Sequence, residues 1–114
     1  MLLNITDGQG FPQKIIAVGQ ETVVDVSGVI AATGVSQVLI PANPYRSGFI
    51  MQNCSDDFMY VNDLGNAAAP PETANNGSFV VAAGAFFPPP GYPISTGAIS
   101  ISGTINDTFT ARAW

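Results

Sequence analysis

The sequence predicts an all-β protein, a two-sheet antiparallel β-sandwich or jelly roll of about eight short strands. Short runs rich in β-branched and aromatic residues recur along the 114-residue chain, and turn-forming residues separate them. No window of about 11 residues or more carries an apolar stripe at helical spacing. Together these observations favour strands over helices throughout the chain.

Eight runs have the composition expected of strands. They are Lys14–Val18, Glu21–Ser27, Ser36–Ile40, Gly48–Cys54, Phe58–Asn62, Ser78–Ala83, Ala98–Ser102 and Thr108–Ala113. The stretch Val29–Thr33 is also compatible with a helical turn, but Gly28 and Gly34 bracket it and favour a loop.

The first 13 residues are expected to form an N-terminal arm, and residues 14–114 a single β-sandwich domain. The arm combines a few apolar side chains with two glycines and a proline, which is unlike a strand of the sandwich. Termini are ordered only where something holds them. We therefore expect the arm to lie on a neighbouring subunit, with anchors at Leu2, Leu3, Ile5 and Phe11.

Alternation of apolar and polar residues assigns faces to the later strands. In Ala98–Ser102 the isoleucines are expected to face inward and the serines outward, and Phe109 and two alanines of Thr108–Ala113 to face inward. The runs Phe49–Met51 and Phe58–Val61 instead carry bulky apolar groups on both faces. In so small a domain this pattern indicates a subunit contact rather than a third layer.

Three loops have distinctive compositions. Asn53–Asp57 is rich in turn-forming residues and is expected to close a hairpin. Residues 62–77 form a long stretch without strand character, which is typical of a functional or a disordered loop. Phe87–Pro93 contains four prolines and is expected to form an extended bend that crosses between the sheets.

Charge and rare residues exclude several classes of function. With 3 basic and 8 acidic residues and a net charge of −5, the chain cannot form the basic surface that nucleic acids or anionic membranes require. No apolar run is long enough to span a membrane, and the N-terminus does not resemble a secretory signal, so synthesis in the cytoplasm is expected. A single cysteine excludes an intrachain disulfide, and the lack of histidine excludes Ser–His and Cys–His pairs.

For the remaining groups of acidic residues, we favour a structural interpretation over a functional one. Asp56, Asp57 and Asp63 could supply oxygen ligands for Ca²⁺, but aspartates at turns usually serve turn geometry. Asp25 and Glu72 are the only carboxylates that could be nominated as a glycosidase pair, and nothing fixes their separation. We expect no enzyme activity, no cofactor, no metal and no small-molecule ligand.

Several single residues leave two readings open. An aromatic platform for a sugar could involve Tyr45, Tyr60, Phe86, Tyr92 and Trp114, although aromatic residues at strand spacing more often belong to the core. Trp114 either caps the edge of the sandwich or anchors in a neighbouring subunit. Cys54 is expected to be a buried, inert thiol, and Arg46 and Arg112 either bind carboxylates or are solvated.

Residues 44–114 also carry an ordered series of motifs. These are an arginine, an apolar run and Gln-Asn-Cys-Ser-Asp within Arg46–Asp56, the aromatic strand Phe58–Val61, the alanine- and glycine-rich strand Val80–Phe87, the stretch Pro93–Ser100 after a proline turn, and the closing strand Phe109–Trp114. In this order they resemble the small β-sandwich virion proteins of tailed bacteriophages, above all capsid decoration or cement proteins.

The resemblance implies a structural role in the virion. Such a protein would decorate and stabilise the capsid as a homo-oligomer and contact the major capsid protein or another virion protein. The residues expected at these contacts are Leu2, Leu3, Ile5, Phe11, Arg46, Tyr60 and Trp114. The alternative is a tail or head-fibre component that contacts host glycans, which would show an exposed aromatic and carboxylate cluster on its loops, above all at 62–77.

Overall fold

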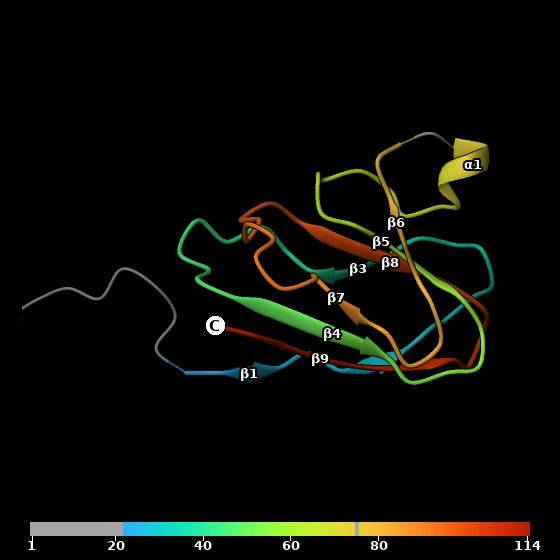
Figure 1. The fold of residues 1–114 in the computed structure, drawn as a ribbon, viewed down its shortest axis with the longest axis horizontal. Coiled ribbons are helices and arrows are strands. Elements are labelled where there is room, and N and C mark those ends of the chain that lie inside the picture. Colours follow the sequence, from blue (N-terminus) through green and yellow to red (C-terminus); the bar gives the residue numbers. More distant parts are fainter. Residues whose placement is uncertain (1–21, 75) are drawn as a thin grey trace, which may run out of the picture.

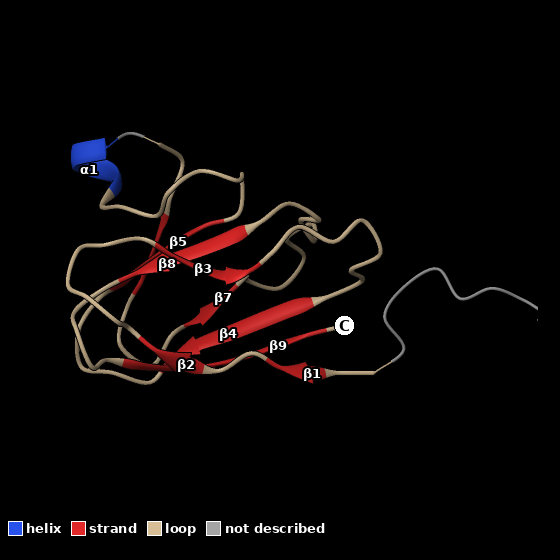
Figure 2. Ribbon diagram, turned by 180° about the vertical axis from the view of Figure 1, so that it is seen from behind, coloured by secondary structure: helices blue, strands red, loops and turns tan. Residues whose placement is uncertain are grey.

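The computed structural model describes residues 22–74 and 76–114, which form nine short strands in two antiparallel sheets (Figure 1). The two sheets pack against each other, and Figure 2 shows the same arrangement from behind. The predicted all-β, two-sheet sandwich is confirmed. The expected arm at residues 1–13 and the expected strand Lys14–Val18 lie outside the described residues.

The first sheet, sheet A, is built around its longest strand. Its members are β1 (Val24–Asp25), β2 (Gly28–Val29), β4 (Phe49–Asn53), β7 (Phe86–Phe87) and β9 (Thr108–Ala113). Strand β9 pairs with β1 and β2 on one edge and with β4 on the other, and β4 pairs in turn with β7.

The second sheet, sheet B, has the order β3-β8-β5-β6. These strands are β3 (Gln37–Ile40), β5 (Met59–Asn62), β6 (Phe79–Val81) and β8 (Ile99–Ser102). From β2 onward, every connection between strands crosses from one sheet to the other except the one from β5 to β6. With β1 and β2 counted as one interrupted strand, this is the eight-strand arrangement of a jelly roll.

The apolar core lies between the sheets. Phe49 and Met51 of β4 and Phe109 of β9 face Met59 and Val61 of β5, and all five are buried. The inward and outward alternation predicted for Thr108–Ala113 is confirmed, because its phenylalanine and alanines are buried. Each large buried side chain of this kind contributes about 1.5–3 kcal/mol through burial of apolar surface.

The outward serines predicted for β8 are not exposed. Ser100 and Ser102 are buried, and Ser102 is only 1% exposed. The reason is that β8 is a central strand, so the flanking strands β3 and β5 shield its small serine side chains from both sides. The alternation was therefore correct in direction, but small side chains on a central strand are shielded even on the outer face.

The hairpin predicted at Asn53–Asp57 is wrong, because β4 and β5 belong to different sheets. The segment is an arch between the sheets, held by the fully buried Asn53. Its Nδ2 donates to the carbonyl oxygens of Asp57 (2.7 Å) and Val81 (2.9 Å), and its Oδ1 accepts from the amide of Ser55 (2.9 Å). Turn-forming residues favour reversal of the chain in a hairpin and in an arch alike. They do not determine whether the next strand joins the same sheet or the other one.

A second buried asparagine, Asn62, organises the long segment that follows β5. Its Nδ2 donates to the carbonyl oxygen of Asn76 (2.9 Å) and to Oγ of Ser78 (3.2 Å), while its Oδ1 accepts from the amide of Leu64 (2.9 Å). Within the segment lies a single helical turn, α1 (Pro71–Ala74).

The short strands β2 and β7 differ from the sequence expectations. Val29–Thr33 was expected to be a loop, but Val29 pairs with β9 together with the preceding Gly28. The stretch Val80–Phe87, expected as one strand from the resemblance, is divided between β6 in sheet B and β7 in sheet A. Gly84 allows the turn between them, because its φ of 77° is one that side-chain-bearing residues rarely adopt.

The proline-rich bend crosses between sheets, as predicted. It begins at the end of β7 in sheet A and leads to β8 in sheet B. In the part of the chain that the structure describes, no helix is long and apolar enough to cross a membrane.

Candidate functional site

Two surfaces are candidates for function, one on the outer face of each sheet. On sheet A, register places Ile50 opposite Arg112, and Gln52 opposite both Thr110 and Phe86. Their side chains and neighbouring backbone line a shallow hollow of about 70 Å³. Phe86 is 57% exposed, so this face presents apolar surface to solvent.

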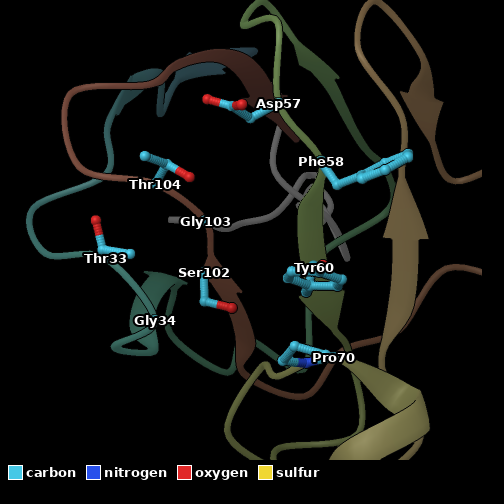
Figure 3. Close-up of a pocket in the computed structure, with 9 residues that line it drawn as sticks. All are labelled: Thr33, Gly34, Asp57, Phe58, Tyr60, Pro70, Ser102, Gly103 and Thr104. Atoms are coloured by element: carbon cyan, nitrogen blue, oxygen red, sulfur yellow. The ribbon is translucent and has the colours of Figure 1, made fainter.

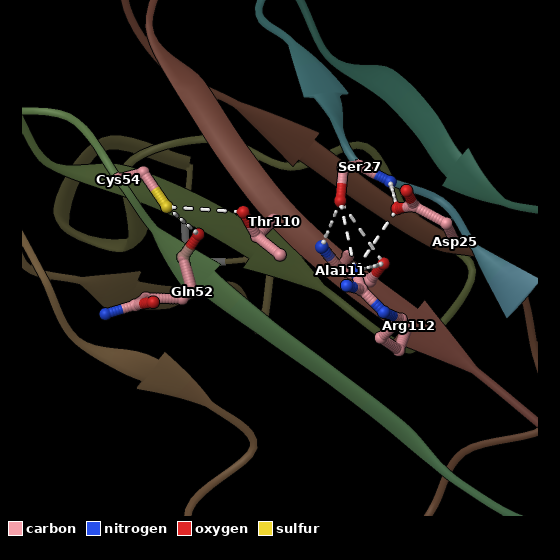
Figure 4. Close-up of polar contacts among 7 residues, drawn as sticks. All are labelled: Asp25, Ser27, Gln52, Cys54, Thr110, Ala111 and Arg112. Atoms are coloured by element: carbon pink, nitrogen blue, oxygen red, sulfur yellow. Dashed lines mark hydrogen bonds and ion pairs between the residues drawn. The ribbon is translucent and has the colours of Figure 1, made fainter. Parts of the chain in front are cut away.

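The charges at the edge of this face are paired with each other. Nη1 of Arg112 lies 3.2 Å from Oδ1 of Asp25, and that oxygen also accepts from the amide of Ser27 at 3.0 Å (Figure 4). Hydrogen bonds from Ser27, assisted by the nearby Arg112, lower the pKa of the Asp25 carboxyl. Arg112 therefore brings no isolated charge to the sheet A face.

Cys54 lies on the same face, and its predicted burial is wrong. The side chain is exposed, with Sγ 3.5 Å from Oγ1 of Thr110 and 3.6 Å from the carbonyl oxygen of Gln52 (Figure 4). Alternation explains this position, because the preceding Asn53 faces the interior.

Arg46, expected at a subunit or capsid contact, is used inside its own chain. Its side chain is 4% exposed and donates to the carbonyl oxygens of Ser95 (2.7 and 3.0 Å), Pro41 (3.1 Å) and Gly97. The guanidinium thus ties the loop before β4 to the loop before β8, and it binds carbonyl oxygens where a carboxylate or solvent had been expected. It is not presented to a partner.

Trp114 packs against its own chain as a cap. Its carbonyl oxygen accepts from the amides of Ser47 (2.6 Å) and Gly48 (2.9 Å), and its amide donates to the carbonyl oxygen of Gly48 (3.0 Å). The indole lies over Gly48 so closely that a Cβ there would be 2.1 Å from a ring carbon. The indole is half-buried, which fits the interpretation of Trp114 as a cap on the sandwich edge.

A hollow of about 300 Å³ lies on the outer face of sheet B (Figure 3). Its lining combines hydroxyl, aromatic and carboxyl groups from several segments. The lining residues are Thr33, Gly34, Asp57, Phe58, Tyr60, Pro70, Ser102, Gly103 and Thr104.

Two carboxyl groups interact at the rim of this sheet B hollow. The neighbouring Asp107 raises the pKa of the Asp57 carboxyl, through a hydrogen bond to the protonated form and through charge repulsion. Asp107 also has a buried Oδ2 that no donor among the described residues reaches.

The acidic residues considered for metal binding or catalysis are not brought together. Strand β5 separates Asp57 from Asp63, whose Oδ2 accepts from the hydroxyl of Tyr92 at 2.9 Å. Among the residues described, no group of three or more histidine, cysteine or acidic side chains could hold a metal ion. Asp25 lies in sheet A, whereas Glu72 lies in α1 beyond sheet B.

The aromatic residues grouped by the sequence analysis are also dispersed. Tyr60 lies on sheet B and Phe86 on sheet A, while Tyr92 packs against the rings of Phe79 (5.8 Å between centroids) and Phe87 (5.7 Å). Sequence reasoning named Asp57 as a possible Ca²⁺ ligand and Tyr60 as part of an aromatic platform and as a contact residue, but it missed the hydroxyl residues that meet them in the sheet B hollow. No local pattern marks those residues, because they come from distant loops.

Compared with known proteins, the chain matches no family model, no curated protein and no solved structure.

Proposed function

We propose that this protein is a non-enzymatic structural component of a tailed-phage virion, which decorates and stabilises the capsid as a homo-oligomer. The observation that carries the proposal is the outer face of sheet A, which combines exposed apolar side chains with neutral polar ones. Ile50 and Phe86 are exposed there, and the one arginine beside them is paired with Asp25. Such a surface packs against a protein neighbour without desolvating isolated ions.

Two further features support this role. Jelly rolls are a recurrent architecture of viral capsid domains, which raises the expectation by analogy of fold alone. The ordered motifs from Arg46 to Trp114 resemble virion proteins of tailed phages. The mechanism is passive, since each copy bridges neighbouring capsid subunits and many weak contacts add through multivalency.

The positions of the expected contact residues support the choice of one surface. Arg46 is committed to its own chain and Trp114 to Gly48. Tyr60 is half-buried on sheet B, and the four residues of the arm lie outside the described residues. We therefore assign the main contact to the sheet A face, with Ile50 and Phe86 as its apolar centre.

Quantitative mass spectrometry of purified particles of the parent virus tests the role. A ratio near one copy per major capsid protein, or a simple fraction of it, is expected for a protein that covers the lattice. A few copies would place the protein at the tail or the portal vertex and favour contact with host glycans. Absence from the particle would overturn the virion assignment.

Two matched variants test the contact surface. Phe86→Ser alters the sheet A face, and Phe58→Ser alters an equally exposed phenylalanine (58%) at sheet B. We expect Phe86→Ser to reduce the oligomer mass measured by light scattering and to weaken particle binding, while Phe58→Ser leaves both unchanged. The opposite result would move the contact to sheet B, and no effect of either would refute contact through these faces.

A further inference from the structure

The sheet B hollow is assembled from segments that the fold ties together. The amide of Gly34 donates to the carbonyl oxygen of Gly103 (3.0 Å), and the amide of Ile105 donates to Oγ1 of Thr33 (2.9 Å). These bonds join the loop before β3 to the loop after β8. The hollow is therefore largely preformed, which lowers the ordering cost of binding a ligand.

Its lining combines polar and apolar groups and carries little charge. In Figure 3 the side chains of Thr33, Thr104 and Asp57 stand around one side, while Tyr60 and Pro70 lie on the other. Hydroxyl groups both donate and accept hydrogen bonds. The tyrosine ring and the proline supply apolar surface next to them.

The chemistry of the lining selects a class of ligand. Within the described part of the chain, no lysine or arginine lines the hollow, and the carboxyl of Asp57 repels anions. A wholly apolar ligand would strip water from the threonine hydroxyls without replacing its hydrogen bonds. A neutral compound with many hydroxyl groups and an apolar face satisfies both parts of the lining.

The carboxyl groups of Asp57 and Asp107 at the rim also suit a neutral ligand with many hydroxyl groups. Because Asp107 raises the pKa of Asp57, that carboxyl keeps its proton to a higher pH than an isolated aspartate. Its oxygens accept hydrogen bonds with or without the proton, and sugar hydroxyls donate them.

We propose that the sheet B hollow binds a neutral saccharide, with room for about one sugar ring. The volume of about 300 Å³ lies at the lower end of the range for ligand cavities. This site is separate from the sheet A contact and adds a binding function to the structural role proposed above. The two proposals therefore stand or fall independently.

The test is titration of the ¹⁵N-labelled protein, followed by the amide resonances. The probes are glucose, galactose and N-acetylglucosamine, with choline and inorganic phosphate as a cation and an anion. We expect at least one sugar to shift the resonances of Gly34, Phe58, Tyr60 and Thr104 with a saturable dependence on concentration. Shifts with choline or phosphate alone, or sugar-induced shifts confined to other regions, would overturn the proposal.

Two variants separate this site from non-specific binding. Asp57→Ala removes the charged hydrogen-bonding group and is expected to weaken sugar binding about tenfold. Phe86→Ala is the control on sheet A, and it is expected to leave the affinity unchanged. The resonance pattern of each variant reports whether it is folded, and equal affinity of Asp57→Ala and the unmodified protein would overturn the proposal.

Discussion

At the scale of single residues, buried polar groups determine how the strands connect. Asn53 is fully buried, yet hydrogen bonds satisfy both ends of its amide. These bonds reach β6 and the far side of the arch that leads to β5. Removing one partner from such a network leaves the others buried and unsatisfied, which costs more than the bond itself contributed.

We therefore expect Asn53→Ala to lower the free energy of unfolding by about 2–4 kcal/mol. The loss follows from the carbonyl oxygens of Asp57 and Val81, which would lose their donor. Urea denaturation measures it, with Asn66→Ala as a control because that side chain is exposed. Equal stability of the two variants would contradict the role assigned to Asn53.

The shifted pKa values of the Asp57 and Asp25 carboxyls predict opposite dependences of stability on pH. The raised pKa of Asp57 means that its contribution to stability is present below the unfolded value near 3.8 and is lost as pH rises through the folded pKa. Asp57→Asn removes the repulsion from Asp107 and is expected to give a small gain in stability near neutral pH. The gain should disappear in acid.

Asp25 provides the matched comparison. Its lowered pKa means that it stabilises the fold above the unfolded value near 3.8, and this contribution is lost as pH falls through the folded pKa. Asp25→Asn should therefore destabilise the protein near neutral pH and have no effect in strong acid. Thermal unfolding of both variants across this pH range is the measurement, and changes of the same sign would contradict the assignment.

At the scale of elements, the sequence predicted the strands that have one buried face. It did not predict connections and pairings that tertiary contacts determine. Alternation identified the inward side of β9, and the prolines identified the crossing from β7 to β8. The two-residue strands β1, β2 and β7 are too short to show a period. The arch at Asn53 has the same turn residues as a hairpin, so only the pairing of β4 with β9 distinguishes them.

The ends of β4 and β9 supply a test at this scale. Gly48→Ala would place a methyl group where the indole of Trp114 lies, and it is expected to cost about 1–3 kcal/mol. Because the chain has one tryptophan, its fluorescence should shift towards that of an exposed indole. The same substitution in a Trp114→Ala background should cost less, and equal costs in both backgrounds would rule out the cap.

At the scale of the whole molecule, composition predicted a surface with few charges, but it could not predict where the charged residues lie. The described residues show that one arginine is buried and the other is paired. The sheet B hollow was beyond sequence reasoning, because Thr33 and Ile105 are 72 residues apart when they meet. The aromatic residues that the sequence grouped are likewise set apart by the fold, with Tyr60 on sheet B, Phe86 on sheet A and Tyr92 packed against Phe79 and Phe87.

The position of β9 in sheet A has a consequence for how the protein acquires its structure. Val24 pairs with Ala113, so strands from opposite ends of the sequence must meet before sheet A is complete. Pairings between such distant segments slow folding, typically to milliseconds or seconds in all-β domains. During synthesis on the ribosome, β1, β2 and β4 would wait without their common partner until residues 108–113 emerge. The nascent chain therefore exposes strand edges for most of its synthesis, and its yield in a cell depends on how well it avoids aggregation in that interval.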